Sequence, residues 1–485
     1  MALFGGIQIT GKPDLENVRR LDLLPQPMVR RMMQYGIAID KEWFYDLSGR
    51  LEREMSVLRG DIVSYIPEEK LDEFISRSNL DSDTEYLPMN VDSGPQLARL
   101  LFDTLGIGKD RQLKLTKSGD RVSTGKKQLE ILKRTHPIVQ RILDYRERAK
   151  LKSTYSNKLP QIARLHPSGS CWCGIKHLAA TWRVHTEFLS TRTDTGRFAS
   201  KNPNLQNIPS RTALGREIRK GFIPSPGTRF VACDFAQEEM RIGAHYSNDS
   251  NLIRIFELGI DPHNETAKRA FATDTPDYLT QRTPSRNVNF GVFYGLSGPG
   301  LYDLMAVTYA TAQDKDPNLV MPDWLTVEWC DDFIRQWFED LYPGVQAYLD
   351  QQYYRARRYG IVWTLFGRIR RVPETQSVHQ HIRSAGLRQS GNLPIQGTGA
   401  DLMKLAMGEV EENLVQLHQE GAWCWPLLTI HDELLTEVEE EWAPFVKDLM
   451  SSVMSNVMRD KDTDEWCCRV PLTADGKIMS RWEKG

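Results

Sequence analysis

The chain has 485 residues, 40% hydrophobic and 26% charged, an ordinary composition for a globular protein with two or three core-sized units. No apolar run is long enough to cross a bilayer, and the N-terminus lacks the segments of a signal peptide. Seven cysteines without a framework spacing favour a reducing, cytoplasmic compartment. Because the net charge is only −2, attraction to a polyanion would require locally clustered Arg and Lys.

Apolar residues at helical spacing dominate the first part of the chain. Residues 25–75 are predicted to be helical from the positions of Met32, Ile37, Leu47, Leu51 and Leu58. A further helix is predicted from Ser93 to Leu105, and the polar segment that follows is predicted to be an exposed basic loop.

The segment 136–160 predicts a long helix whose last turns are basic. Its cations are Arg146, Arg148, Lys150, Lys152 and Lys158. Such a run is commonly a solvated helix face, and it can also be a stripe that follows a phosphate backbone. The run alone does not decide between the two interpretations.

Short strands with turn signals are predicted between residues 161 and 246, including "WRVHTEF" and "RFVACD". Residues 247–382 are predicted to be mostly helical. From residue 383 onward, a helix over "GADLMKLAMGEVEENLVQLHQEG" alternates with the short strands "PLLTI" and "LLTEV". The helical block therefore interrupts a strand-containing core, which favours an α+β fold over βαβ repeats.

Two segments of this core carry acidic residues where a strand ends. In "RFVACDFAQEEMRIGAH" a buried strand ends at Asp234, and a helix is predicted from Gln237. In "LLTIHDELLTEV" two alternating runs flank His431, Asp432 and Glu433, as in a tight hairpin. One Asp in a turn is usually structural. Converging carboxylates are what divalent metals need, and two metals about 3.5–4 Å apart can clamp an in-line phosphoryl transfer.

Arg282, Arg286, Phe290 and Tyr294 recur at a spacing of four between these acids. On a helix they would form a row along one face, with the helix beginning near Thr283 because Pro284 belongs in a first turn. Cations followed by aromatic rings suit a triphosphate and then a base. An aromatic row at this spacing is also common in core packing.

Several spaced motifs, in order, resemble those of family A DNA polymerases, the group of bacterial DNA polymerase I and its phage relatives. They are "MMQYGIAID", "DYRERAKLKSTYSNKLP", "DTGRFASKNPNLQNIPSR", "DFAQEEMR", "RTPSRNVNFGVFYG", "RQSGNLPIQGTGADLMKLAM" and "HDE". The resemblance runs from about residue 22 to the C-terminus, and several motifs in the family's order are far more specific than any one of them.

The resemblance implies a right-hand polymerase fold with an antiparallel-sheet palm and helical fingers and thumb. The expected divisions are an N-terminal extension (1–21), a thumb (22–160), a palm (161–246 and 383–485) and fingers (247–382). The implied activity is template-directed addition of deoxynucleotides to a primer 3′-hydroxyl. The implied partners are primer–template DNA and deoxynucleoside triphosphates, with the chain a monomer and replication accessory proteins as further partners.

The implied location is the cytoplasm of a bacterium or of a phage-infected cell. No 3′→5′ exonuclease is expected, because only about twenty residues precede the thumb. Two alternatives are a phage-type single-subunit RNA polymerase and an inactive DNA-binding module. Glu239 and "NLQNIP" argue against the first, and retention of both metal acids argues against the second.

Roles for individual residues follow from the same resemblance. Asp234 and Asp432 would ligate two Mg²⁺ ions, with Mn²⁺ as a substitute, and Glu433 would be a weaker helper. Glu239 would exclude a ribose 2′-hydroxyl and hydrogen-bond Tyr294. Nucleotide contacts are assigned to Gln237, Glu239, His263, Arg282, Arg286, Phe290 and Tyr294. DNA contacts are assigned to Arg197, Asn207, Arg241, Arg388, Asn392, Gln396 and His431, and to Lys150, Lys152 and Lys158.

Three features depart from the family pattern. Arg286 stands where the family usually has Lys, and a guanidinium cannot readily lose a proton, so any general-acid catalysis by this residue should be poorer. Glu238 replaces an aliphatic residue and has no assigned role. The segment "HPSGSCWCGIKH" carries His166, Cys171, Cys173 and His177, which could bind Zn²⁺. Their spacing is not that of a standard finger, and an ordinary loop is the favoured interpretation.

Overall fold

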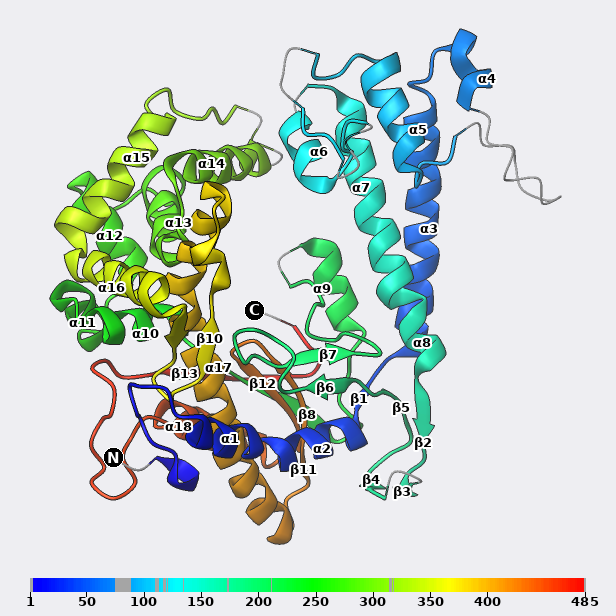
Figure 1. Cartoon of the computed structure of the whole chain (residues 1–485). Helices are drawn as coiled ribbons and strands as arrows, with labels where there is room; N and C mark the ends of the chain where they lie inside the picture. Colours follow the sequence, from blue (N-terminus) through cyan, green and yellow to red (C-terminus); the bar gives the residue numbers. More distant parts are fainter. Residues whose placement is uncertain are drawn as a thin grey trace. The chain divides into compact units, whose positions relative to one another are not determined.

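The computed structural model of the chain forms two compact units (Figure 1). The first comprises Met1–Ala38, His166–Asn207 and Pro224–Arg481, and the second Ile39–Leu165, Ile208–Ile223 and Trp482–Gly485. The structure describes residues 3–74, 89–109, 113–116, 119, 121–133, 135–171, 174–210, 212–313, 316 and 318–483. None of the helices within these ranges is long and apolar enough to cross a membrane.

A four-stranded antiparallel sheet forms the core of the first unit, in the order β11-β12-β8-β13. Its strands are β8 (Thr228–Phe235), β11 (Cys424–Ile430), β12 (Glu433–Glu439) and β13 (Ala474–Met479). Phe230, Val231 and Cys233 are fully buried on the central strand, and helix α18 (Ala443–Ser455) packs against β8 and β13. The predicted strands at "RFVACD", "PLLTI" and "LLTEV" are therefore confirmed, as is the tight hairpin between β11 and β12.

The long helix α17 (Gln380–Gln419) has 40 residues and packs against α2, α10, α16, α18 and β11 (Figure 1). It begins well before the predicted start at Gly399, because Pro394 and several glycines obscure its first half in the sequence. These glycines allow close packing. A Cβ at Gly391 would lie 2.6 Å from Leu349 Cδ2, and one at Gly397 would lie 2.6 Å from Thr364 Cγ2.

The remaining helices of the first unit are α1 (Leu15–Leu23), α2 (Gln26–Tyr35), α10 (Glu238–Ser247), α11 (Ser250–Glu257), α12 (Pro262–Phe271), α13 (Thr283–Gly291), α14 (Gly298–Gln313), α15 (Val327–Gln336) and α16 (Pro343–Tyr359). Its short strands are β1 (Ile37–Ala38), β3 (Gly169–Ser170), β4 (Lys176–His177), β5 (Thr181–Val184), β6 (Glu187–Leu189), β7 (Ala199–Lys201), β9 (Ile361–Trp363) and β10 (Ile369–Arg371). Strand β2 (Arg164–His166) lies where the chain passes between the units. Residues 247–382 are thus mostly helical as predicted, apart from the β9–β10 hairpin.

The second unit is helical, with α3 (Lys41–Val63) and α7 (Pro137–Leu151) running side by side (Figure 1). Its other helices are α4 (Leu71–Phe74), α5 (Gly94–Ala98), α6 (Lys126–Leu132), α8 (Lys158–Ile162) and α9 (Ala213–Lys220). The core includes Leu58, Ile62, Leu97, Leu129 and Ile142. The predicted helix from Ser93 is confirmed, with Ser93 as its N-cap and a π-helical turn at Arg99–Thr104.

The prediction of continuous helix over residues 25–75 is wrong at Ile37. Gly36 has φ +68° and ends α2, and Ile37 lies in β1, paired with Val184 of β5. A Cβ at Gly36 would lie 2.7 Å from the Val184 carbonyl oxygen, so this close approach admits only glycine.

A fully buried ion pair joins β5 to the central sheet. Arg183 Nη2 lies 2.6 Å from Glu437 Oε2, and neither side chain is exposed to solvent. Arg183 also donates to the carbonyls of Tyr35 (3.0 Å) and Gly36 (3.1 Å). Glu437 Oε1 accepts from the Ser225 N–H at 2.6 Å. The pair is therefore saturated with hydrogen bonds, which buried charges require.

We expect Glu437→Gln to lower the free energy of unfolding by about 3–5 kcal/mol, because it leaves the Arg183 charge buried without a counter-ion. Urea denaturation of the variant and of the wild type measures the difference. Glu440→Gln is the matched control, since Glu440 pairs with Arg229 at the surface and should change stability by less than about 1 kcal/mol. Equal losses in the two variants would contradict the prediction.

Candidate active site

The two predicted metal acids lie together at one end of the central sheet. Asp234 is the penultimate residue of β8 and is the register partner of Glu433, the first residue of β12. The Phe235 N–H donates to the carbonyl of Asp432 at 3.2 Å. The fold thus brings Asp234, Asp432 and Glu433 together from segments about two hundred residues apart.

The hairpin turn that carries Asp432 contains two residues, because Ile430 and Glu433 are register partners. His431, the other turn residue, has φ +57° and is exposed. A positive φ suits tight hairpin turns and is tolerated by His more readily than by most residues. The same turn geometry therefore presents both His431 and Asp432 at the sheet end.

A fourth acid at this end of the sheet, Asp475, was not predicted from the sequence. Asp475 of β13 is the register partner of Asp234 on the side away from β12. Directly opposed residues share a face of an antiparallel sheet, so Glu433, Asp234 and Asp475 form a row across three strands. The segment around Asp475 shows no clear alternation, and strand register cannot be read from one sequence.

Glu239, in the first turn of α10, is held on both of its carboxylate oxygens. Arg197 Nη2 lies 2.6 Å from Oε1, and the Tyr294 hydroxyl donates to Oε2. Gln396 Nε2 in turn donates to the Tyr294 hydroxyl at 2.7 Å. Burial, together with the Glu239 carboxylate, raises the pKa of Tyr294, so its hydroxyl stays protonated and can donate. The predicted Glu239–Tyr294 hydrogen bond is confirmed.

The cationic and aromatic row is not one continuous α-helix. Helix α13 begins at Thr283, as predicted, and ends at Gly291. Arg282 belongs to the preceding π-helical turn, and Tyr294 to a following 3₁₀ turn. Arg286 is exposed on α13, whereas Arg282 is tied to Asp261 Oδ2 and Asn264 Oδ1, each at 2.8 Å.

His263, in the first turn of α12, is a neutral hydrogen-bond donor. Burial lowers its pKa to about 4. The Trp337 indole, which can only donate, lies 2.7 Å from Asn289 Oδ1 and so orients that amide. Asn289 Nδ2 then donates to His263 Nδ1 at 3.1 Å, which places the ring proton on Nε2. The Phe290 ring lies 5.1 Å from the imidazole between centroids.

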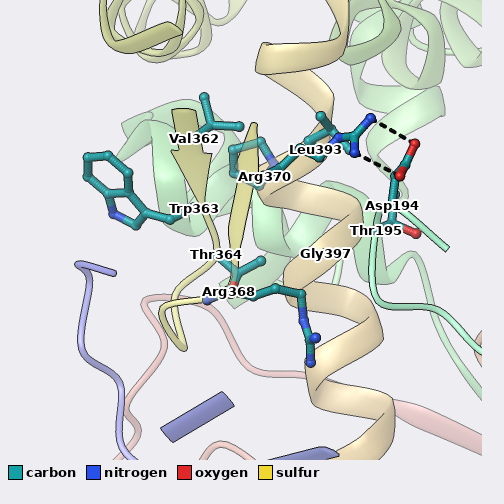
Figure 2. Close-up of a pocket in the computed structure, with 10 residues that line it drawn as sticks. Asp194, Thr195, Val362, Trp363, Thr364, Arg368, Arg370, Leu393 and Gly397 are labelled. Atoms are coloured by element: carbon teal, nitrogen blue, oxygen red, sulfur yellow. Dashed lines mark hydrogen bonds and ion pairs between the residues drawn. The ribbon is translucent and has the colours of Figure 1, made fainter. Parts of the chain in front are cut away.

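The loop that carries Arg197 is fixed by an ion pair. Figure 2 shows the Asp194 carboxylate joined twice to the Arg370 guanidinium of β10, with both contacts at 2.7 Å. Below it, Arg368 lies 2.7 Å from Asp401 of α17 and 2.6 Å from Asp22 of α1. These pairs position the site but join residues far apart in sequence, so the sequence analysis did not find them.

The predicted DNA contacts differ in their surroundings. Arg388 and Asn207 are exposed, and Gln237 has φ +55° at the N-cap of α10. Asn392 is half-buried, and its Oδ1 has no hydrogen-bond partner within the described ranges. Arg197 and His431 line one cavity of about 20 Å³.

The predicted DNA contact of Arg241 is wrong. It is buried, it donates to the carbonyls of Ala236 and Pro471, and its guanidinium lies 4.6 Å from the Phe256 ring centroid. The side chain is therefore committed to the interior of the first unit and is not presented to DNA.

In the second unit, the basic run is partly neutralised. Lys152 Nζ lies 2.6 Å from Glu52 Oε2, and Arg148 Nε lies 2.6 Å from Glu54 Oε2. Lys150 and Lys158 are exposed. The solvated-face interpretation therefore applies best to Arg148 and Lys152, and the two exposed lysines are the better candidates for phosphate contacts.

Glu238, to which the sequence assigned no role, is a buried carboxyl group close enough to Asp432 and Asp234 to feel their charges. It packs so closely on α17 that a Cβ at Gly399 would lie 2.7 Å from its Oε2. Its Oε1 has no hydrogen-bond partner in the part of the chain that the structure describes. Burial, reinforced by the charge of Asp432, raises the pKa of Glu238 to about 8. At neutral pH this residue is mostly a neutral acid, so it adds little negative charge to the site.

Comparison with solved structures defines the class of protein. The chain matches the POL domain of Pol1 from M. smegmatis, in complex with a DNA primer-template and dNTP, with a TM-score of 0.72 and 30% identity. The match covers 96% of this chain and 72% of that chain. The expected α+β, right-hand polymerase fold is thereby confirmed.

The chain belongs to DNA polymerase family A, whose sequence model matches residues 75–484. A thermostable DNA polymerase I of Thermus aquaticus is 42% identical over 400 residues, which cover 81% of this chain and 42% of that protein. The DNA polymerase I of Deinococcus radiodurans is 35% identical over 477 residues, which cover 97% of this chain and 43% of that protein. The chain thus spans less than half the length of these relatives. Membership of the family implies use of divalent metal ions.

We expect the stability of the wild type and of Glu238→Gln to depend differently on pH. The raised pKa of Glu238 makes its ionisation unfavourable in the folded state, and this cost grows as pH rises from the unfolded pKa near 4.3 to about 8. In metal-free buffer, the free energy of unfolding of the wild type should fall relative to that of the variant by up to about 3 kcal/mol between about pH 5 and pH 8. Urea denaturation at each pH measures this difference.

Asp448→Asn serves as the control, because the Asp448 side chain is 74% exposed and its removal should alter the pH profile little. Parallel pH profiles for the wild type and Glu238→Gln would contradict a buried, titrating carboxyl.

Proposed function

We propose that the protein is a DNA-directed DNA polymerase that adds deoxynucleotides to a primer 3′-hydroxyl on a template strand. The observation that carries the proposal is the meeting of Asp234 and Asp432 at one end of the central sheet. The names of the relatives support the activity, and the DNA primer-template and dNTP of the structural relative support the same partners here. Its bacterial relatives favour work on DNA inside a bacterial cell, including one infected by a phage.

The residues at the sheet end fit two Mg²⁺ ions, which Mn²⁺ can replace, because carboxylate oxygens are the ligands that these hard cations prefer. Asp234 and Asp432 would supply the shared ligands, with Glu433 beside them. When bound, such a pair of ions activates the primer hydroxyl and neutralises charge on the triphosphate and the departing pyrophosphate. A neutral Glu238 keeps excess negative charge away from the incoming triphosphate.

The triphosphate would be bound from α12 and α13. Arg286 offers an exposed fork of donors, and His263 offers its Nε2–H. Arg282 is already paired with Asp261, which partly neutralises its charge. Phe290, beside His263, would pack against the sugar, and Tyr294 would lie near the templating base.

Glu239 would select deoxynucleotides by occupying the space of a ribose 2′-hydroxyl. Because Arg197 and Tyr294 hold its two oxygens, the carboxylate cannot turn aside without breaking charge-assisted hydrogen bonds. Arg197, at the edge of this network, would contact the minor groove of the primer–template end. Gln396, Arg388, Asn392 and Asn207 would contact the DNA, and His431 would lie near the primer end.

We assign the palm to the sheet-containing segments 161–246 and 383–485, the fingers to 247–382 and the thumb to 22–160. The second compact unit supports the thumb assignment over residues 39–160, and exposed Lys150 and Lys158 would contact the DNA backbone there. We assign a monomeric state, with replication accessory proteins as additional partners.

We expect Asp234→Asn and Asp432→Asn each to reduce primer extension by roughly three orders of magnitude, about 4 kcal/mol of transition-state stabilisation, because each removes a charged metal ligand. Extension of a labelled primer on a defined template with Mg²⁺ measures the rate. Asp448→Asn, an exposed acid on α18, is the control and should retain the wild-type rate. A near-normal rate in either active-site variant would refute the assignment.

We expect Glu239→Ala to raise ribonucleotide incorporation relative to deoxynucleotide incorporation by roughly ten- to a hundredfold, because it removes the blocking carboxylate. Single-nucleotide insertion with matched ribo- and deoxynucleotides measures the ratio. Tyr294→Phe keeps the ring but loses the bond to Glu239, so its effect should be smaller and in the same direction. An unchanged ratio in Glu239→Ala would mean that selectivity arises elsewhere.

A further inference from the structure

A second cluster of potential metal ligands lies apart from the acids Glu433, Asp234 and Asp475 of the central sheet. His166 ends β2, Cys171 directly follows β3, and His177 ends β4. One ligand atom from each residue lies within 4.8 Å of the others. His166 Nδ1 is 3.1 Å from His177 Nε2 and 3.2 Å from Cys171 Sγ. Both histidines are buried, and the cysteine is half-buried. Cys173, the fourth residue noted in this segment, lies outside the described residues.

The proton positions in this cluster follow from a neighbouring histidine. His185 Nδ1 lies 2.9 Å from the Met33 carbonyl, which can only accept, so this nitrogen carries the proton. A neutral His185 then accepts at Nε2, where His166 Nε2 lies 2.9 Å away and must donate. The remaining nitrogen of a neutral His166, Nδ1, therefore presents a lone pair.

This single lone pair meets two other ligand atoms, from His177 and Cys171. The His177 ring also stacks on Tyr35, with centroids 5.0 Å apart and planes 9° apart, which fixes its orientation. With Cys171 as a thiolate and His177 presenting its Nε2 lone pair, the three ligand atoms would converge on one cation.

The distances agree with a tetrahedral zinc site. Zn–N bonds of about 2.0–2.1 Å and Zn–S bonds of about 2.3 Å place adjacent ligand atoms about 3.3–3.6 Å apart. The two separations from His166 Nδ1, 3.1 and 3.2 Å, are close to these values. The hydrogen bond from His166 through His185 to the Met33 carbonyl is the outer support that metal-binding histidines usually have.

We propose that His166, Cys171 and His177 bind one Zn²⁺ ion, which clamps the β3–β4 hairpin to the end of β2. Thiolate and imidazole ligands select zinc-like metals over Mg²⁺, so this site is chemically distinct from the carboxylate pair. The fourth position is open to water or to a further ligand. The site serves the fold and does not depend on the polymerase assignment.

Cobalt substitution tests the proposal. The chelator-stripped full chain, in excess Mg²⁺ to occupy the carboxylate site, is titrated with Co²⁺ and followed by absorption spectroscopy. One equivalent should produce the visible bands of tetrahedral cobalt and a thiolate charge-transfer band in the near ultraviolet. Added Zn²⁺ should displace the cobalt stoichiometrically and should raise the melting temperature of the stripped protein.

Cys171→Ser should abolish the charge-transfer band and weaken cobalt binding at least tenfold. Cys467→Ser is the control, because it alters a half-buried thiol outside the cluster, and it should leave the band and the affinity unchanged. Circular dichroism verifies that both variants fold. The absorption spectrum of the cobalt-loaded wild type tests the proposal even if a variant does not fold. Absence of the thiolate band in the wild type, or its persistence in Cys171→Ser, would overturn the proposal.

Discussion

The pairing of β8 with β12 is the constraint on which the rest of the site depends. Side chains alternate along a strand, so a slip of one residue would move Asp234 to the opposite face of the sheet and away from Glu433. The buried Arg183–Glu437 pair and the packing of α18 resist such a slip. The metal chemistry proposed for this chain therefore rests on ordinary strand register, secured by contacts well away from the reacting atoms.

Three carboxyl groups close in sequence lie in different surroundings. Asp234 is half-buried at the end of a strand, Glu238 is buried and mostly neutral, and Glu239 is paired with Arg197. The first suits a cation, the second keeps the local charge low, and the third suits a fixed steric barrier. One short segment thus holds three acids whose environments differ through burial and hydrogen bonding rather than through residue type.

Much of the sheet and the placement of the acids could be predicted from the sequence, because alternation and turn residues are local signals. The starts of the helices at Gly94 and Thr283 could likewise be predicted, from Ser93 and Pro284. The Glu239–Tyr294 bond was expected only through the family resemblance. Asp475, the Asp194–Arg370 pair and the burial of Arg241 depend on register and on tertiary packing, which no local pattern encodes. The His–Cys cluster was visible as a motif, but its convergence required the fold.

Helix α17 contacts both helices and strands of the first unit. At about 60 Å, it is long enough to cross a whole domain. Its C-terminal half is anchored by Asp401 and Lys404 to the buried charges around Asp22, whereas Gln396 touches the network around Glu239. Pro394 lies two residues before Gln396 and cannot donate the helical hydrogen bond to residue 390. The helix is therefore most easily bent at Pro394, so its N-terminal part can tilt while Gln396, on the anchored side of the bend, keeps its place beside Tyr294 and Glu239.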